Sequence, residues 1–433
     1  MERYFDLAAK GTSIRTEVIA GITTFLTMAY IIFVNPDILA MTGMDRNAVF
    51  VATCLAAAVG SLIMGFWANW PIGMAPGMGL NAFFAFTVVG MMGFTWQQAL
   101  GAVFISGLIF LFLSVTGIRR WLISGIPASM RSAIAAGIGL FLAIIALQSS
   151  GIVVGNPATL VALGDLTQAG ALLTIAGFFV IVALDALRVT GAILIGILAV
   201  TVVSIALGVS QFGGVVSMPP SIAPTFLQMD LLGALTFGIV QVVLVMVLVE
   251  VFDATGTLIG VAKRAGLLTE GPTHTNKNLG RALMADSTAI TAGAMLGTSS
   301  TTAYVESASG VQAGGRTGLT AVVVGVLFLA AMFFAPLAGA VPAYATAPAL
   351  LYVATLMVRE LSEVTWDDVT EAAPSVLTAI AMPLTYSIAN GLAFGFISYA
   401  VIKLLTGRAR EVHAATWIIA ALFTAKFALF GAH

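Results

Sequence analysis

Two acidic residues, Asp253 and Glu306, lie in stretches that are otherwise almost free of charge. Asp253 stands in VLVEVFDATGTL and Glu306 in GTSSTTAYVESASG. A carboxylate at membrane depth costs about 2.5 to 3.5 kcal/mol on insertion scales, so acids there usually belong to a substrate or ion pathway. Both acids lie beside glycine or hydroxyl residues that interrupt an apolar chain. This combination predicts a polytopic membrane transporter.

The composition agrees with a chain that lives in lipid. Hydrophobic residues make up 60% of it and charged residues 9%, whereas soluble proteins carry about 25% charged residues. The net charge of -1 argues against a nucleic-acid partner. One cysteine, Cys54, and three scattered histidines argue against a disulfide framework or a metal site, and no cofactor is expected. The opening MERYFDLAAK has no apolar core, so we expect no cleavable signal peptide.

Apolar stretches long enough to approach a membrane span, about 20 residues, recur along the whole chain. We predict about fourteen spans, at 17–34, 47–66, 72–92, 97–116, 132–149, 169–187, 190–208, 231–259, 282–296, 301–313, 319–336, 343–358, 372–389 and 390–405. A further apolar stretch, 414–430, follows. It is either another span or an interfacial helix, and Lys426 in its middle favours the second.

The basic residues support this segmentation. With a cytoplasmic N-terminus, loops after even-numbered segments face the cytoplasm, where Lys and Arg accumulate. Of the 18 basic residues, only Arg46 and Lys426 fall elsewhere. The cytoplasmic set is Arg3, Lys10, Arg15, Arg119, Arg120, Arg131, Arg188, Lys263, Arg264, Lys277, Arg281, Arg316, Arg359, Lys403, Arg408 and Arg410.

The third and tenth segments cannot be continuous helices. The third overlaps PIGMAPGMGLNAFF (71–84), and the tenth overlaps GTSSTTAYVESASG (297–310). Proline and glycine break helices, and open backbone at membrane depth is tolerated only where protein buries it or where it lines a cavity. The two segments are seven apart, which indicates a seven-plus-seven inverted repeat with its site where they meet. Each is expected to be a short extended piece leading into a half-helix.

The half-helix starts suggest the site residues. The first would begin near Gly79 with Asn81 in its first turn, and the second near Tyr304 with Glu306 in its first turn. An amide and a carboxylate there suit a planar heterocycle with both donors and acceptors. Glu250 and Asp253 share one helix face because they are three residues apart.

Each candidate also has a structural interpretation. Asp253 could cap a helix end, Glu250 could pair with a neighbour, Glu306 could simply favour a helix dipole, and Asn81 could satisfy broken backbone. Asp286 could be a helix-start residue near the cytoplasm. Four aromatic side chains could stack on a ring, although such residues more often serve packing: Phe83, Phe84, Phe252 and Tyr304.

Enzymatic motifs are missing from the sequence. It contains no HExxH, no Walker A run and no nucleophile–base spacing. We therefore expect a transporter and not an enzyme.

Five strings together resemble the nucleobase–cation symporter family with the uracil and xanthine permease fold, and most closely its AzgA-like branch of hypoxanthine, guanine and adenine permeases. They are ITTFLTMAYIIFVNP, APGMGLNAFFAF, EVFDATGTLIG, GTSSTTAYVESASGVQAGGRTGL and MPLTYSIANGLAFGFISY.

The resemblance implies an all-α polytopic fold with a core domain (16–117 and 229–337) and a gate domain (130–210 and 342–406). The substrate would lie between the two domains, and an elevator-like movement of the core would alternate access to it. It implies substrate binding by Asn81, Asp253 and Glu306, to which we add Thr302, Tyr304 and Phe252. Proton coupling falls to Asp253, Glu306 and Glu250, with Na⁺ the less favoured ion. A multi-pass protein of the plasma (cell inner) membrane is expected, and related proteins are often homodimers.

The sequence thus predicts proton-coupled import of a purine base, without ranking hypoxanthine, guanine and adenine. The main alternative is an anion transporter of the same fold, for sulfate or bicarbonate, although two pocket acids would repel such substrates. A channel and a membrane-embedded enzyme are further alternatives.

Overall fold

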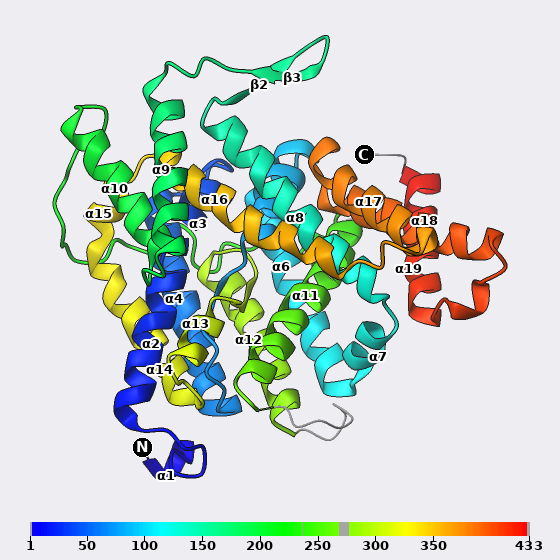
Figure 1. The fold of residues 1–433 in the computed structure, drawn as a ribbon, viewed down its shortest axis with the longest axis horizontal. Helices are drawn as coiled ribbons and strands as arrows, with labels where there is room; N and C mark the ends of the chain where they lie inside the picture. Colours follow the sequence, from blue (N-terminus) through cyan, green and yellow to red (C-terminus); the bar gives the residue numbers. More distant parts are fainter. Residues whose placement is uncertain (1, 236, 268–276, 431–433) are drawn as a thin grey trace.

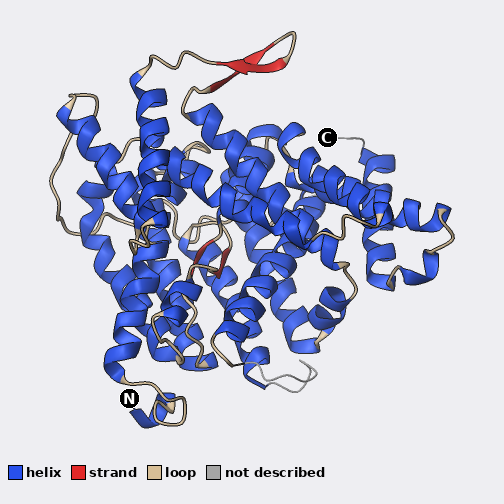
Figure 2. Cartoon of the chain, in the orientation of Figure 1, coloured by secondary structure: helices blue, strands red, loops and turns tan. Residues whose placement is uncertain are grey.

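The computed structural model describes residues 2–235, 237–267 and 277–430, and these are overwhelmingly helical (Figure 2). The α-helices are α1 (Glu2–Phe5), α2 (Ile14–Met28), α3 (Ile31–Ala40), α4 (Arg46–Ile63), α5 (Met78–Ala82), α6 (Trp96–Thr116), α7 (Ile118–Ser124), α8 (Ala128–Ser149), α9 (Ala169–Ala186), α10 (Ala192–Ala206), α11 (Phe237–Arg264), α12 (Lys277–Leu296), α13 (Ser307–Gln312), α14 (Gly318–Ala331), α15 (Ala335–Ala340), α16 (Ala343–Val358), α17 (Val369–Leu384), α18 (Ile388–Leu405) and α19 (Ala414–Phe430).

Shorter elements complete the chain. Two stretches have wide, π-type turns, η1 (Met64–Ala68) and η2 (Phe83–Met91). Single 3-10 turns are η3 (Gly233–Leu235), η5 (Met332–Phe334), η6 (Arg359–Glu363) and η7 (Ala409–Glu411). The strands are β1 (Met74–Pro76), β2 (Val153–Asn156), β3 (Leu160–Leu163) and β4 (Thr301–Ala303).

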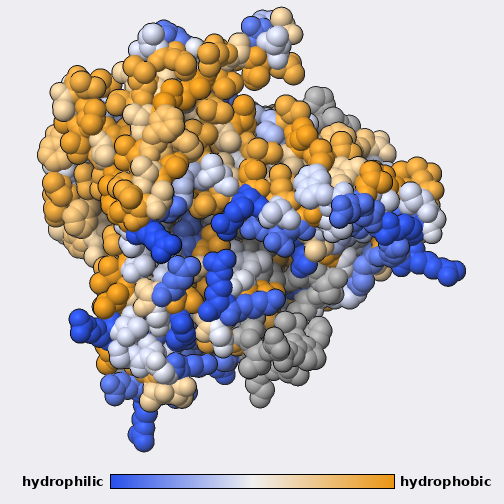
Figure 3. All heavy atoms as spheres, viewed as in Figure 1, coloured by the Kyte–Doolittle hydropathy of each residue, from blue (hydrophilic) through white to orange (hydrophobic). Residues whose placement is uncertain are grey.

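Several helices have the length and apolarity of membrane spans. Within the described residues, 8 helices qualify, and shorter apolar helices accompany them, among them η2 with α5, α10, α17 and α19. Figure 3 shows a broad hydrophobic surface at the upper left, where Figure 1 places α9 and α10. Large apolar side chains of α9, such as Leu172 and Phe179, are exposed. These features confirm a multi-pass membrane protein.

The structure differs from the predicted segmentation in three places. The first predicted segment is divided into α2 and α3, separated by Ala29 and Tyr30, and the eleventh is divided into α14, η5 and α15. An antiparallel hairpin of β2 and β3, which pairs Val153 with Leu163, projects from the top of Figure 1 and was not predicted. Its strands, VVGN and LVAL, are four residues each and do not alternate between apolar and polar residues, so they give no clear strand pattern. The trailing stretch 414–430 is one helix, α19.

Side-chain caps fix several helix starts. Ser13 accepts from the Thr16 amide at α2, Asp45 accepts from the Ala48 amide at α4, and Thr95 forms a capping box with Gln98 at α6. Such caps satisfy the first amides of a helix, which lack a partner within it.

The strands β1 and β4 lie together in the middle of the molecule (Figure 2). Helix α12 packs against α4 and α6, and α14 packs against α2 and α4. Gly60 of α4 permits this close packing, since a Cβ there would lie 3.1 Å from the Cβ atoms of both Ala289 and Met74. Small residues thus let helices enclose the strand pair.

Candidate functional site

The centre of the site is the antiparallel pairing of β1 and β4. Met74 lies opposite Ala303, Ala75 opposite Thr302 and Pro76 opposite Thr301. Two further bonds extend the pair: the Tyr304 amide donates to the Gly73 carbonyl (3.0 Å), and the Gly77 amide donates to the Ser300 carbonyl (2.8 Å). Segments more than 200 positions apart therefore satisfy each other's backbone, as buried backbone requires.

Serine hydroxyls satisfy the backbone that this pair leaves open. Ser61 Oγ accepts from the Met74 amide (2.9 Å) and lies 3.2 Å from the Met74 carbonyl oxygen. Ser307 Oγ accepts from the Gly73 amide (3.0 Å). These hydroxyls serve the backbone, as hydroxyls near broken helices commonly do.

Asn81 lies in α5, which begins at Met78, one residue before the predicted start. The side chain is fully buried. Its Nδ2 donates to Oδ1 of Asn35 (3.0 Å), and its Oδ1 has no hydrogen-bond partner among the described residues. Asn81 therefore presents a buried acceptor that the protein itself leaves unused.

Glu306 stands at the N-cap of α13 and not in its first turn as expected, because the strand β4 ends only at Ala303 and a turn follows. Its side chain is partly accessible. Oε1 accepts from the Tyr30 hydroxyl over 2.6 Å. Thr27 Oγ1 lies 3.5 Å from the Glu306 carbonyl oxygen. The contact with Tyr30 holds the carboxyl group beside the junction of α2 and α3.

Glu250 is fully buried in α11. The Ser300 hydroxyl donates to its Oε1 (2.6 Å), and its Oε2 has no partner among the described residues. Because Ser300 directly precedes β4, this bond connects α11 to the strand pair. Phe252 and Asp253 also belong to α11, but their side chains lie outside what the structure describes.

Thr302 and Tyr304 both make contacts within the protein. Thr302 Oγ1 lies 3.3 Å from Asp286 Oδ1, and the Tyr304 hydroxyl donates to the Pro76 carbonyl (2.6 Å). Tyr304 is two residues from Glu306 and Pro76 five from Asn81, so this bond ties together the segments that carry the two candidates.

Asp286 is not a helix-start residue near the cytoplasm: it is fully buried inside α12. Its Oδ2 lies 3.2 Å from Arg119 Nη2, and its Oδ1 accepts from the Ala303 amide (3.3 Å). Arg119, which the charge count assigned to a loop, is fully buried over the ring of Phe110, 3.9 Å from its centroid. Arg119 and Asp286 pair with each other because buried ions need a counter-ion. Through its bond to the Ala303 amide, Asp286 also stabilises the position of β4.

Tyr30 and Asn35 are not among the site residues predicted from the sequence. Both lie in TMAYIIFVNP, one of the strings that carried the family resemblance. Asn35 is a fully buried amide directly before Pro36. A polar residue inside an apolar helix and beside a proline was the available signal.

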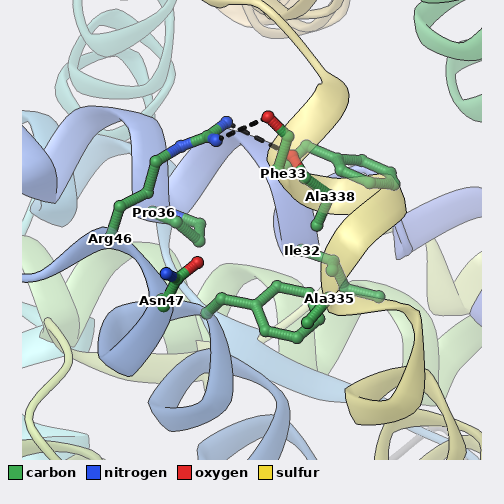
Figure 4. Close-up of a pocket in the computed structure, with 9 residues that line it drawn as sticks. Ile32, Phe33, Pro36, Arg46, Asn47, Ala335 and Ala338 are labelled. Carbon is green, nitrogen blue, oxygen red and sulfur yellow. Dashed lines mark hydrogen bonds between the residues drawn. The ribbon is translucent and has the colours of Figure 1, made fainter. Parts of the chain in front are cut away.

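A surface pocket is lined by a different set of residues (Figure 4). Its lining is largely apolar and comes from α3, α4 and α15: Ile32, Phe33, Pro36, Arg46, Asn47, Phe50, Ala335, Ala338 and Gly339. Arg46 is engaged by Asp37 (2.6 Å) and by the carbonyl oxygen of Ala338 (3.3 Å). This pocket contains none of the candidate site residues.

Metal-ligating side chains do not gather anywhere in the described ranges. No group of three or more His, Cys, Asp or Glu there could hold a metal ion. Among the described residues, the site offers the free acceptor of Asn81 and the carboxyl groups of Glu306 and Glu250, which can accept or, when protonated, donate hydrogen bonds.

A helical membrane protein with interrupted helices around interior acids belongs to the class of membrane transporters. The chain belongs to the permease family, whose pattern matches residues 15–394. The predicted resemblance to the nucleobase–cation symporters and their AzgA-like branch is confirmed.

Two relatives match along almost their whole length. The chain is 49% identical over 433 residues to the adenine permease AdeP of Escherichia coli (strain K12), covering 100% of this chain and 97% of that protein. It is 47% identical over 425 residues to the guanine/hypoxanthine permease PbuG of Bacillus subtilis (strain 168), covering 95% and 96% respectively.

Solved structures share the fold at low identity. The transmembrane domain of the cyanobacterial bicarbonate transporter BicA superposes with a TM-score of 0.63 at 16% identity, covering 94% of this chain and 97% of that one. SLC26A9 gives a TM-score of 0.65 at 9% identity, covering 91% and 66%. At these identities the likeness concerns the fold alone.

Proposed function

We propose that this protein imports purine nucleobases, namely hypoxanthine, guanine or adenine, by proton symport. The observation that carries the proposal is the unpaired acceptor of Asn81 in the same strand-centred site as the carboxyl groups of Glu306 and Glu250. Relatives named as adenine and guanine/hypoxanthine permeases support the purine class. A purine offers ring N–H groups to such acceptors.

The substrate would lie against the β1–β4 pair. Glu306 and Asn81 would bind its polar edge, Asp253 would contribute a second carboxylate, and Thr302, Tyr304 and Phe252 would line the remaining surface. Tyr304 is tied to Pro76 by its hydroxyl, so its part would be to present a ring face.

Proton coupling would use Glu306, Glu250 and Asp253. Moving an ionised carboxyl group through a low-dielectric region is unfavourable, and protonation removes that penalty. The full burial of Glu250, whose Oε2 has no hydrogen-bond partner among the described residues, supports this role. Protons are therefore favoured over Na⁺ as the coupling ion.

Alternating access would follow the seven-plus-seven arrangement of fourteen segments, in which the two strand-containing segments are the third and the tenth. The core (16–117 and 229–337) would move as an elevator against the gate (130–210 and 342–406). The pairing of β1 with β4 supports a core built from both halves, and the packing of α8 against α16 and α17 supports a separate gate. A cytoplasmic N-terminus, a plasma-membrane location and a homodimer complete this proposal.

An anion transporter is the second candidate, because the fold is shared with a bicarbonate transporter. Buried carboxyl groups near the strand pair oppose it, since like charges repel across a low-dielectric site. Inhibition of uptake by bicarbonate or sulfate would distinguish this candidate.

The test is uptake of labelled hypoxanthine, adenine and guanine into cells that lack their own purine permeases, with and without a protonophore. We expect saturable uptake, which unlabelled purines should block and the protonophore should abolish. Glu306→Gln should abolish it, whereas Glu363→Gln, at an exposed acid, should not. Absence of uptake by protein shown to reside in the membrane, or normal uptake by Glu306→Gln, would overturn the proposal.

A further inference from the structure

Four fully buried polar side chains form a hydrogen-bonded cluster behind Asn81: Asn81 itself, Asn35, Thr53 and Thr298. They come from α5, α3, α4 and the turn that precedes β4. Asn35 Nδ2 lies 2.7 Å from Thr53 Oγ1 and 2.8 Å from Thr298 Oγ1, and Asn81 Nδ2 lies 3.0 Å from Asn35 Oδ1.

The direction of these bonds is set at Thr53. Its hydroxyl donates to the Val49 carbonyl oxygen (2.7 Å), which can only accept. A hydroxyl has a single hydrogen. Toward Asn35, therefore, the Thr53 oxygen can only accept.

Asn35 must then turn its NH₂ group to Thr53, which leaves its carbonyl oxygen facing Asn81. A carbonyl oxygen only accepts, so Asn81 must turn its own NH₂ group toward Asn35. The Asn81 oxygen is left pointing elsewhere, and it is this atom that has no partner. Each step allows a single arrangement, so the amide orientations follow from the network.

Thr298 carries no such direction. The described contacts give its hydroxyl no carbonyl oxygen to donate to, so it can serve Asn35 as an acceptor or as a donor. Both threonines therefore contact the Asn35 amide, but only Thr53 fixes which way that amide is oriented.

We propose that Thr53 and Asn35 are positioning residues that present Asn81 to the substrate as an acceptor, so that the site selects a ligand with an N–H group at that edge. This proposal rests on the proposed nucleobase transport. A buried acceptor without a partner is unfavourable, and a substrate N–H group would satisfy it.

The decisive variant is Thr53→Val, which keeps the shape of threonine and removes the hydroxyl. Thr298 alone then permits either orientation of Asn35, so Asn81 can also present its NH₂ group. The matched controls are Thr53→Ser, which restores the hydroxyl, and Thr298→Val, which removes an equivalent bond without removing the direction.

The measurement is competition by a panel of N-methylpurines, each lacking one ring N–H, and deazapurines, each lacking one ring acceptor. The variant Asn81→Ala identifies which panel members report on Asn81. In the wild type, the reporting compound should be an N-methylpurine. Thr53→Val should change the affinity ratio between donor-bearing and donor-lacking ligands by roughly tenfold, the factor that one hydrogen bond of ~1.4 kcal/mol represents.

The ratio should stay at the wild-type value in Thr53→Ser and Thr298→Val, even where overall affinity falls. An equal change in both valine variants, or no change in either, would overturn the positioning role and leave nucleobase transport intact. A wild type that transports no purine overturns the proposed function instead. If Thr53→Val does not reach the membrane, Thr53→Ala tests the same loss. A wild-type site that senses a deazapurine through Asn81 refutes the assigned orientation directly.

Discussion

Tyr30 donates its hydroxyl hydrogen to Oε1 of Glu306 over 2.6 Å, and the two residues are 276 positions apart. Tyr30 is fully buried at the junction of α2 and α3, and Glu306 stands at the N-cap position of α13. The contact connects the α2–α3 junction to the start of α13, a helix that packs against α2. It gives the carboxyl group of the candidate site a fixed position before any substrate arrives.

Removing this hydroxyl should weaken substrate binding. Tyr30→Phe leaves Glu306 without its side-chain donor, so the carboxyl group becomes less ordered. A hydrogen bond to a charged group contributes ~1.5 to 3 kcal/mol, so we expect KM for purine uptake to rise roughly tenfold or more, with normal membrane abundance. Tyr4→Phe, which removes an exposed hydroxyl bonded to the Phe66 carbonyl, should leave KM unchanged. An unaltered KM in Tyr30→Phe would argue against a role for the contact.

A single methyl group should disturb the same region at Gly310. A Cβ there would overlap Thr24 Oγ1 and lie 2.7 Å from the Ala20 carbonyl oxygen, so α13 would have to move away from α2. We expect Gly310→Ala to lose most transport activity. Gly280→Ala, where a Cβ meets nothing within 4 Å, is the control and should transport normally. Wild-type uptake by Gly310→Ala would mean that α13 tolerates displacement.

The buried pair of Arg119 and Asp286 should show strong non-additivity. Losing one partner leaves a buried charge without its counter-ion, which costs ~3 to 5 kcal/mol, so Arg119→Met and Asp286→Leu should each lower thermal stability sharply. The double variant should be more stable than either single one. It should remain below the wild type because Asp286 also accepts from the Ala303 amide. Thermal unfolding in detergent measures this, with exposed Arg410→Met as the control.

Acid should weaken the contacts of Asp368 with Thr370 and Arg408 at the start of α17. Hydrogen bonds from Thr370 and Arg408 hold the pKa of Asp368 well below its ordinary value of 3.8. A lowered pKa in the folded state contributes stability above the ordinary value, and that stability is lost as the pH falls below it. Asp368→Asn should therefore unfold at a lower temperature near pH 7, with a smaller difference from the wild type at pH 3. Exposed Asp367→Asn should follow the wild-type curve at every pH.

The local sequence determined the helical, multi-pass class and the family, and it selected Asn81, Glu250 and Glu306 as candidates. These inferences depend on apolar length, on helix-breaking residues and on acids in apolar surroundings, all of which are properties of short windows. The range 414–430 is an example of what a short window can predict, because the apolar stretch in the sequence and the helix α19 have the same bounds. The proline and glycines in APGMG likewise predicted a short extended piece before a half-helix, where the structure has β1 and α5.

Only the tertiary structure decided which groups meet. It paired Tyr30 with Glu306 and placed Asp286 against Arg119. It also left the Asn81 oxygen without a partner, at the end of a series of hydrogen bonds that begins at Thr53. No window of sequence contains both partners of these contacts. The physical reason is that hydrogen-bond direction and ion pairing depend on distances of a few ångströms, and those distances are set by the packing of helices from distant parts of the chain.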